Sequence, residues 1–120
     1  MTLLEMESAV REMLLDNFAG SYRWPSVFIL NSLYEGVQLL FQLRPESRYS
    51  GLELVKLTIP VVTAQTLATE QAKTLYIDPR WNRALIYYAA GKCLEIDSAD
   101  TANAQRSTEY LSQFNNLAKL

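Results

Sequence analysis

The sequence predicts a mainly α fold: a four-helix bundle-like domain with a β-hairpin or extended arm inserted between helices two and three. Three observations predict it. Apolar residues recur at helical spacing in four segments of the chain. Proline or glycine stands near the ends of several of these segments. Between the second and third segments the apolar residues alternate instead, which is typical of a strand. The length of 120 residues fits one domain, 1–120.

The first helix is predicted at about 3–18. Thr2 and Glu5 have the spacing of a capping box, in which each side chain caps the backbone of the other residue. Apolar residues then recur along one stripe as far as Phe18. Gly20 is the expected end of the helix, because glycine adopts positive φ without steric cost.

The second helix is predicted at about 26–43 and is unusually apolar. It follows Pro25 and ends before Pro45, since proline disfavours helical geometry in the residue before it. A helix that is apolar over most of its circumference has to be covered on nearly all sides. We therefore expect other helices, or another subunit, to cover it. Its polar residues form one thin line: Asn31, Glu35, Gln38 and Gln42.

The arm is predicted at about 52–77. Apolar residues alternate with polar ones from Val55 to Val61, and Pro60 suits an edge or a bend because it cannot donate to a sheet. Residues 74–77 would form the returning strand. The connection 63–73 is compatible with a short helix or with a hairpin loop, and we favour the loop.

The third and fourth helices are predicted at about 79–95 and 101–117. Asp78 suits the N-cap of the third helix and Pro79 its first position. The middle of this helix, "ALIYYAAGKCL", is apolar nearly all round, like the second helix. Its aromatic residues are typical of a core or of an interface, and the sequence does not separate the two.

Enzymatic chemistry is not expected. The chain has no histidine, and its one cysteine, Cys93, falls within an apolar helix with nothing to activate it. No glycine-rich phosphate loop or nucleophile elbow is present. The acidic residues Glu95, Asp97 and Asp100 cluster where helix caps are expected, which explains them without a metal. We predict no catalytic residues, no metal and no cofactor.

The charge pattern favours no strong nucleic-acid site. The formal net charge is −2, so no large basic field attracts phosphate. Basic residues do gather in the middle of the chain, and an ordinary solvated surface explains them more simply than a DNA-contacting one. The longest apolar runs are shorter than the roughly 20 residues that span a bilayer, so no membrane partner is expected.

Several short motifs occur in a recognisable order. Arg23-Trp24 precedes the second helix, Leu30-Asn31 lies inside it and Arg44-Pro45 ends it. "ALIYYAA" is followed by an acidic break and by a last helix with an aromatic–leucine ending. In this order and spacing, over nearly its whole length, the chain resembles the small head-to-tail adaptor (head-completion, or head-tail connector) proteins of tailed bacteriophages. Pro25 and the segment 63–73 depart from that pattern.

The resemblance implies a structural protein of the virion that is not an enzyme. Such adaptors form a homo-oligomeric ring, usually dodecameric, below the portal protein. The ring extends the DNA channel, through which double-stranded DNA passes without sequence-specific contact, and it docks the tail or nozzle proteins. The location implied is the head-tail junction, with the host cytoplasm during assembly. The alternative interpretation is a helical nucleic-acid-binding regulatory protein.

Two sets of site residues follow from these expectations. The last helix is expected to contact the portal and the arm to reach a neighbour or the tail, although the reverse stays open. Charge indicates four channel- or partner-facing residues: Arg44, Arg48, Arg80 and Arg83. Apolar character indicates six candidates for the subunit interface: Trp24, Phe28, Leu39, Trp81, Tyr87 and Tyr88.

Overall fold

The computed structural model describes residues 2–16, 24–50, 53–54, 60–74, 79–96 and 101–119. The mainly helical fold is confirmed. The helices are α1 (Leu3–Leu14), α2 (Ser26–Leu43), α3 (Leu67–Ala72), α4 (Asn82–Ile96) and α5 (Thr101–Lys119), with 3-10 turns at Pro45–Arg48 and Pro79–Trp81. Two short strands, β1 (Tyr49–Ser50) and β2 (Glu53–Leu54), pair antiparallel in the register Tyr49 to Leu54.

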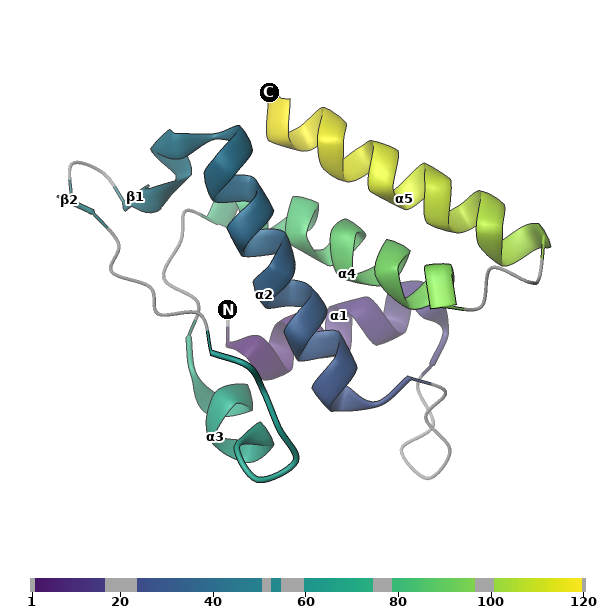
Figure 1. Ribbon diagram of the computed structural model, residues 1–120, viewed down its shortest axis with the longest axis horizontal. Coiled ribbons are helices and arrows are strands. Elements are labelled where there is room, and N and C mark those ends of the chain that lie inside the picture. Colours follow the sequence, from purple (N-terminus) through teal and green to yellow (C-terminus); the bar gives the residue numbers. More distant parts are fainter. Residues whose placement is uncertain are drawn as a thin grey trace.

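Helix α4 is the centre of the arrangement (Figure 1). It packs most extensively against α5, which runs back along it, and then against α2 and α1. The first two helices therefore cover the side of α4 that α5 leaves open. The largest fully buried side chains come from α1, α2, α4 and α5 together, so these four helices share one core.

Helix α1 begins as predicted and ends earlier than predicted. The capping box is present: Thr2 N–H donates to Glu5 Oε1 at 2.9 Å and Glu5 N–H to Thr2 Oγ1 at 3.2 Å. The helix ends at Leu14, not near residue 18, because Leu15 adopts the left-handed conformation at φ 57°. Asp16 N–H then donates to Arg11 O at 2.8 Å, which closes the turn without glycine.

Helix α2 has the bounds that its flanking prolines predict, and it is covered mainly by its own chain. Ile29, Leu30, Leu33, Val37 and Leu40 are completely buried. Of the two expected covers, other helices of the same chain bury this core side. Phe28 and Leu39 on the opposite flank are half-buried and Leu43 is exposed.

The middle segment differs from the predicted hairpin. Residues 67–72 form α3, so the short-helix interpretation of 63–73 is right and the favoured loop interpretation is wrong. Before α3, Asn31 holds the backbone of Val62 through two hydrogen bonds, from Nδ2 to the carbonyl at 3.0 Å and from the amide to Oδ1 at 2.8 Å. After it, Thr74 pairs with Thr2 in an isolated bridge. Residues 55–59 and 75–78 of the predicted arm lie outside the described ranges.

Helices α4 and α5 lie very close at one point. Ser107 Oγ donates to Gly91 O at 2.8 Å, and a Cβ at Gly91 would lie 2.9 Å from Leu111 Cγ. Nearby, the rings of Tyr88 and Phe114 meet edge to face at 5.0 Å.

The third predicted helix is observed as a 3-10 turn leading into α4. In the described ranges, no helix combines the length and apolar character needed to cross a membrane.

Candidate functional site

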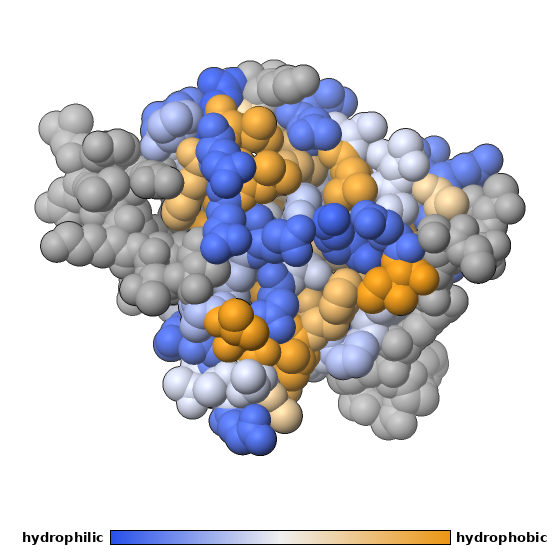
Figure 2. Space-filling model, viewed as in Figure 1, coloured by the Kyte–Doolittle hydropathy of each residue, from blue (hydrophilic) through white to orange (hydrophobic). Residues whose placement is uncertain are grey.

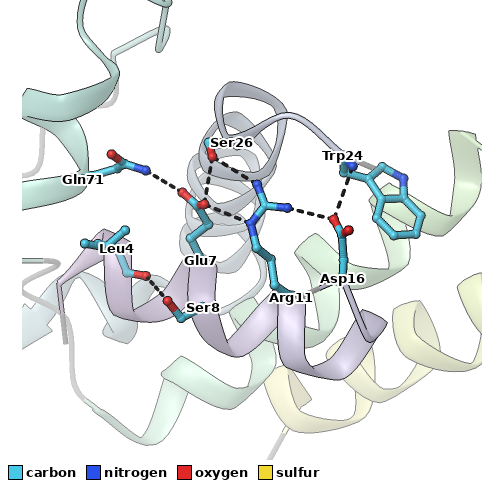
Figure 3. A network of polar contacts seen from close by, with 8 residues as sticks. All are labelled: Leu4, Glu7, Ser8, Arg11, Asp16, Trp24, Ser26 and Gln71. Carbon is cyan, nitrogen blue, oxygen red and sulfur yellow. Dashed lines mark hydrogen bonds and ion pairs between the residues drawn. The ribbon is translucent and has the colours of Figure 1, made fainter. Parts of the chain in front are cut away.

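A buried ionic cluster joins α1 to the start of α2 (Figure 3). Its centre, the Arg11 cluster, is Glu7, Arg11 and Asp16, which are all buried. Arg11 Nε lies 3.0 Å from Glu7 Oε2, and Arg11 Nη1 lies 2.8 Å from Asp16 Oδ2. Arg11 Nη2 donates to Ser26 Oγ at 3.0 Å. One guanidinium thus fixes both ends of the α1–α2 connection.

Neutral groups complete the Arg11 cluster. Ser26 Oγ and Gln71 Nε2 each donate to a different oxygen of Glu7 at 2.8 Å, and the Trp24 amide donates to Asp16 Oδ2 at 3.3 Å. Both oxygens of Glu7 are therefore occupied by partners from α1, α2 and α3. Since buried charges are tolerated when paired and hydrogen-bonded, the arrangement is that of a structural clamp.

A second polar contact holds α3 against α2. Tyr34 Oη donates to Glu70 Oε2 at 2.7 Å, and Lys73 Nζ lies 2.7 Å from Glu70 Oε1. Burial alone would raise the pKa of Glu70, but the hydrogen bonds from Lys73 and Tyr34 hold that pKa below its usual value. Burial and the hydrogen bond to Glu70 raise the pKa of the Tyr34 hydroxyl well above its usual value.

An open groove runs between α2 and α4. It consists of two hollows, of about 290 and 230 Å³, that share Glu35. Each is below the roughly 300–1,000 Å³ of typical small-molecule sites, so each suits a single large side chain better than a ligand. We call it the α2–α4 groove, and its lining residues are Phe28, Ser32, Glu35, Gln38, Leu39, Gln42, Tyr88, Lys92, Glu95 and Ile96.

The α2–α4 groove mixes apolar and acidic side chains. Lys92 Nζ lies 3.8 Å from Glu35 Oε1 and 3.6 Å from Glu95 Oε2, so two carboxylates share one ammonium. Ile96 is 60% exposed. Figure 2 shows hydrophobic patches separated by a hydrophilic band over α2 and α4. Burial and the hydrogen bond to Glu35 raise the pKa of the Tyr88 hydroxyl.

A second surface, the Arg–Tyr strip, is formed by Arg83, Tyr87, Tyr110 and Arg106. Arg83 Nη2 donates to Tyr87 Oη at 3.2 Å, and Arg106 Nη2 to Tyr110 Oη at 3.3 Å. The two tyrosine rings meet at 5.6 Å between centroids. Each guanidinium also lies over the ring of its own tyrosine. The strip therefore joins α4 to α5 through two tilted rings, with one guanidinium beside each ring.

The four arginines predicted by charge are only partly brought together. Arg44 caps α2 and donates from Nε to Ala118 O near the end of α5, while Nη1 lies 3.2 Å from Glu46 Oε1. Arg80 lies over the Trp81 ring at the start of α4, and Arg83 belongs to the Arg–Tyr strip. Because α5 runs back along α4, these three share one end of the molecule (Figure 1). The side chain of Arg48 lies outside the described part.

Three of the six interface candidates are core residues of the chain. Trp24, Trp81 and Tyr88 are 5%, 4% and 4% exposed, so most of each side chain is covered by its own chain. Trp24 Nε1 is held by the Cys93 carbonyl at 2.8 Å, whereas Trp81 Nε1 has no acceptor among the described residues. The other three candidates are half-buried: Phe28, Leu39 and Tyr87.

Among the described residues, those weighed for chemistry are not brought into a reactive arrangement. Cys93 is a buried thiol. Glu95 is an exposed residue of α4 paired with Lys92, while Asp97 and Asp100 lie outside the described ranges. Within those ranges, no three metal-ligating side chains cluster.

Sequence reasoning missed the Arg106 and Tyr110 half of the strip and the acidic side of the groove. The i, i+4 spacing of Arg83–Tyr87 and of Arg106–Tyr110 is a signal that the sequence does contain.

Comparisons with protein-family models, with curated proteins and with solved structures found no match to this chain. The fold and the surface together define a mainly helical protein whose described surface carries two small hollows between α2 and α4, a wider, open hollow of about 600 Å³ on α5 and clustered Arg–Tyr pairs.

Proposed function

We propose that this chain is a non-enzymatic structural subunit of a tailed-bacteriophage head-to-tail adaptor. In this proposal it forms a ring below the portal, extends the DNA channel and docks tail or nozzle proteins. The motif order described for the sequence supports it, and so does a helical core that contains the second, third and last predicted helices.

The observation that carries the proposal is the outward flank of α2 and α4. Phe28 and Leu39 are half-buried and Ile96 is exposed, whereas the other side of both helices is core. Apolar side chains spread along two helices, with hollows the size of one side chain, are suited to a protein partner rather than to a small molecule. A ring subunit needs such a flank because its neighbours cover it.

The remaining parts of the proposal concern the ends of the molecule. The end that holds Arg44, Arg80 and Arg83 supplies cations for sequence-independent contact with DNA phosphates or for an acidic partner. Residues 60–74 pack against α1 and α2 of their own chain, so of the predicted arm we assign the contact with a neighbour or the tail to the short paired strands β1 and β2. Helix α5 contacts the portal, with its exposed face outward.

Mixing with portal rings tests this function. The chain is purified and its mass is measured by light scattering, alone and with portal rings encoded in the same phage genome. The expected result is movement of the chain into the portal peak at one copy per portal subunit. A chain that ignores the portal and is retained on duplex DNA at low salt would favour the regulatory alternative.

A further inference from the structure

We propose that the Arg–Tyr strip of one copy docks into the α2–α4 groove of a second copy. The proposal rests on the proposed ring-forming function and names the two surfaces that would make the ring. Its occupant is the same chain, because the groove and the strip are complementary in charge and in the size of their apolar parts.

The two guanidinium groups of the strip suit it to an acidic partner. Arg83 and Arg106 donate to tyrosine hydroxyls, and Arg106 Nη2 also lies 3.4 Å from Met13 O. Across the described ranges, neither guanidinium has a carboxylate partner. Arginine and tyrosine are the side chains most often found at the energetic centres of protein interfaces. Here both are held in place before any partner arrives.

The groove supplies the acidic and apolar counterpart. Glu35 and Glu95 have side chains 57% and 53% exposed and share only Lys92, which leaves one excess negative charge. The hollow beside Glu95 is about 290 Å³ and is walled by Phe28 and Ile96. That volume receives one aromatic or arginine side chain. A tyrosine from the strip would cover the apolar wall while its arginine meets a carboxylate.

The two surfaces lie on different sides of α4. The contact from Arg106 to Met13 places the strip toward α1, whereas the groove is shared with α2. A contact between two different surfaces is heterologous, so it repeats from copy to copy and closes into a ring or extends into a chain. A symmetric dimer would need the strip of each copy to meet the groove of the other within one interface.

The test uses two charge reversals whose described contacts are local. Arg83→Glu cancels the net positive charge of the strip and places a carboxylate at its α4 end, and Glu95→Lys makes the groove basic. Sedimentation velocity follows self-association of the full chain over a concentration series. Each variant alone is expected to weaken self-association by about tenfold or more, because like charges then face each other. An equimolar mixture is expected to restore it, since both junctions of an alternating assembly are again complementary.

Thr69→Glu and Thr69→Lys are the controls, because Thr69 is an exposed residue of α3 outside both surfaces. They are expected to associate like the unmodified chain. An unmodified chain that stays monomeric at every concentration would overturn the proposal, and so would a mixture that fails to recover. Loss of DNA retention in Arg83→Glu with unchanged self-association would assign the strip to DNA instead. Portal binding by an unmodified but monomeric chain would leave the adaptor function standing while this contact fell.

Discussion

The hydroxyl of Tyr88 donates to Glu35 Oε1 at 2.6 Å, so one short hydrogen bond fastens α4 to α2. The ring of the same tyrosine meets Phe114 of α5 edge to face, and it also passes over Gly36, where an added Cβ would lie 2.9 Å from its Cδ1. Tyr88 therefore contacts α2 and α5, two of the neighbours of α4, at once. Its ring belongs to the core and its hydroxyl to the α2–α4 groove.

Removing the Tyr88 hydroxyl should cost much less than removing its ring. Tyr88→Phe loses one hydrogen bond to a partly exposed carboxylate, worth about 0.5–1.5 kcal/mol. Tyr88→Ala leaves a cavity against Phe114 and should cost about 3–5 kcal/mol of unfolding free energy. Urea denaturation measures both variants. Equal losses would show that the ring contributes nothing beyond its hydroxyl, which contradicts its burial.

Replacing Arg11 should lower the free energy of unfolding, because it removes a positive charge beside two buried carboxylates. Arg11→Met removes the guanidinium that pairs with Glu7 and Asp16, and breaking a buried ion pair in this way costs about 3–5 kcal/mol. The matched control adds Glu7→Gln and Asp16→Asn, which keep hydrogen-bonding oxygens for Ser26 and the Trp24 amide. This triple variant should recover a large part of the loss in urea denaturation. A triple variant as unstable as the single one would show that charge is not the cause.

A methyl group at Gly91 should separate α4 from α5. Gly91→Ala would gain about 0.5–1 kcal/mol of helix propensity. However, its Cβ would lie 2.9 Å from Leu111 Cγ and 3.4 Å from the Leu111 backbone nitrogen, so the neighbour cannot simply turn away. We expect a net loss of about 1–3 kcal/mol, typical of an overfilled core. In a Leu111→Ala background, the same change should become neutral or stabilising.

Both the nitrogen and the oxygen of the Asn31 side-chain amide should be needed to hold the segment before α3. Asn31→Asp keeps an acceptor for the Val62 amide but removes the donor for its carbonyl. A loss of about 1–2 kcal/mol is expected, with faster proteolysis between Pro60 and Thr66. Gln38→Glu makes the same chemical change at an exposed position of α2. If that control is cleaved equally fast, added charge rather than the lost donor is responsible.

The contact between α2 and α3 should weaken at both ends of the pH scale. The pKa of Glu70 is lowered on folding, so its stabilising effect is present above its unfolded value of 4.5 and is lost as pH falls through the folded pKa. The pKa of Tyr34 is raised, so its effect is present below 10.0 and is lost as pH rises beyond that value.

Two variants measure the acidic and the alkaline loss of stability separately. The difference in unfolding free energy between the unmodified chain and Glu70→Gln should shrink as the pH falls from about 6 to about 3. The corresponding difference for Tyr34→Phe should shrink as the pH rises above about 10. Differences that stay constant across these ranges would contradict the assignment of the two groups.

The sequence predicts those helix ends that are set by residues at the end itself. Pro25 and Pro45 bracket α2, and Thr2 with Glu5 starts α1, because these residues act on the backbone next to them. The end of α1 could not be read in this way. Leu15 takes its left-handed conformation in a turn whose next residue, Asp16, is tied to buried Arg11. That contact depends on how α1 meets the start of α2.

Contacts between distant segments also explain what the sequence left open. Helix α3 has six residues, too few to be stable alone, and its described support comes from Tyr34 and Glu7. Trp24 and Trp81 are equally compatible with a core and with an interface until the helices are placed around them. The Arg–Tyr strip follows the same rule, since its two halves are visible in the sequence but their meeting requires the register of α4 against α5.

The position of α5 over α4 has a consequence for how the chain is made. A ribosome releases α4 before α5, so the side of α4 around Gly91 stays bare until the last helix has emerged. A chain interrupted before residue 101 would present this apolar side to chaperones and proteases. Only a chain that includes α5 can place Phe114 and Ala118 over it. Truncation before α5 would therefore turn a buried face of α4 into an exposed apolar one.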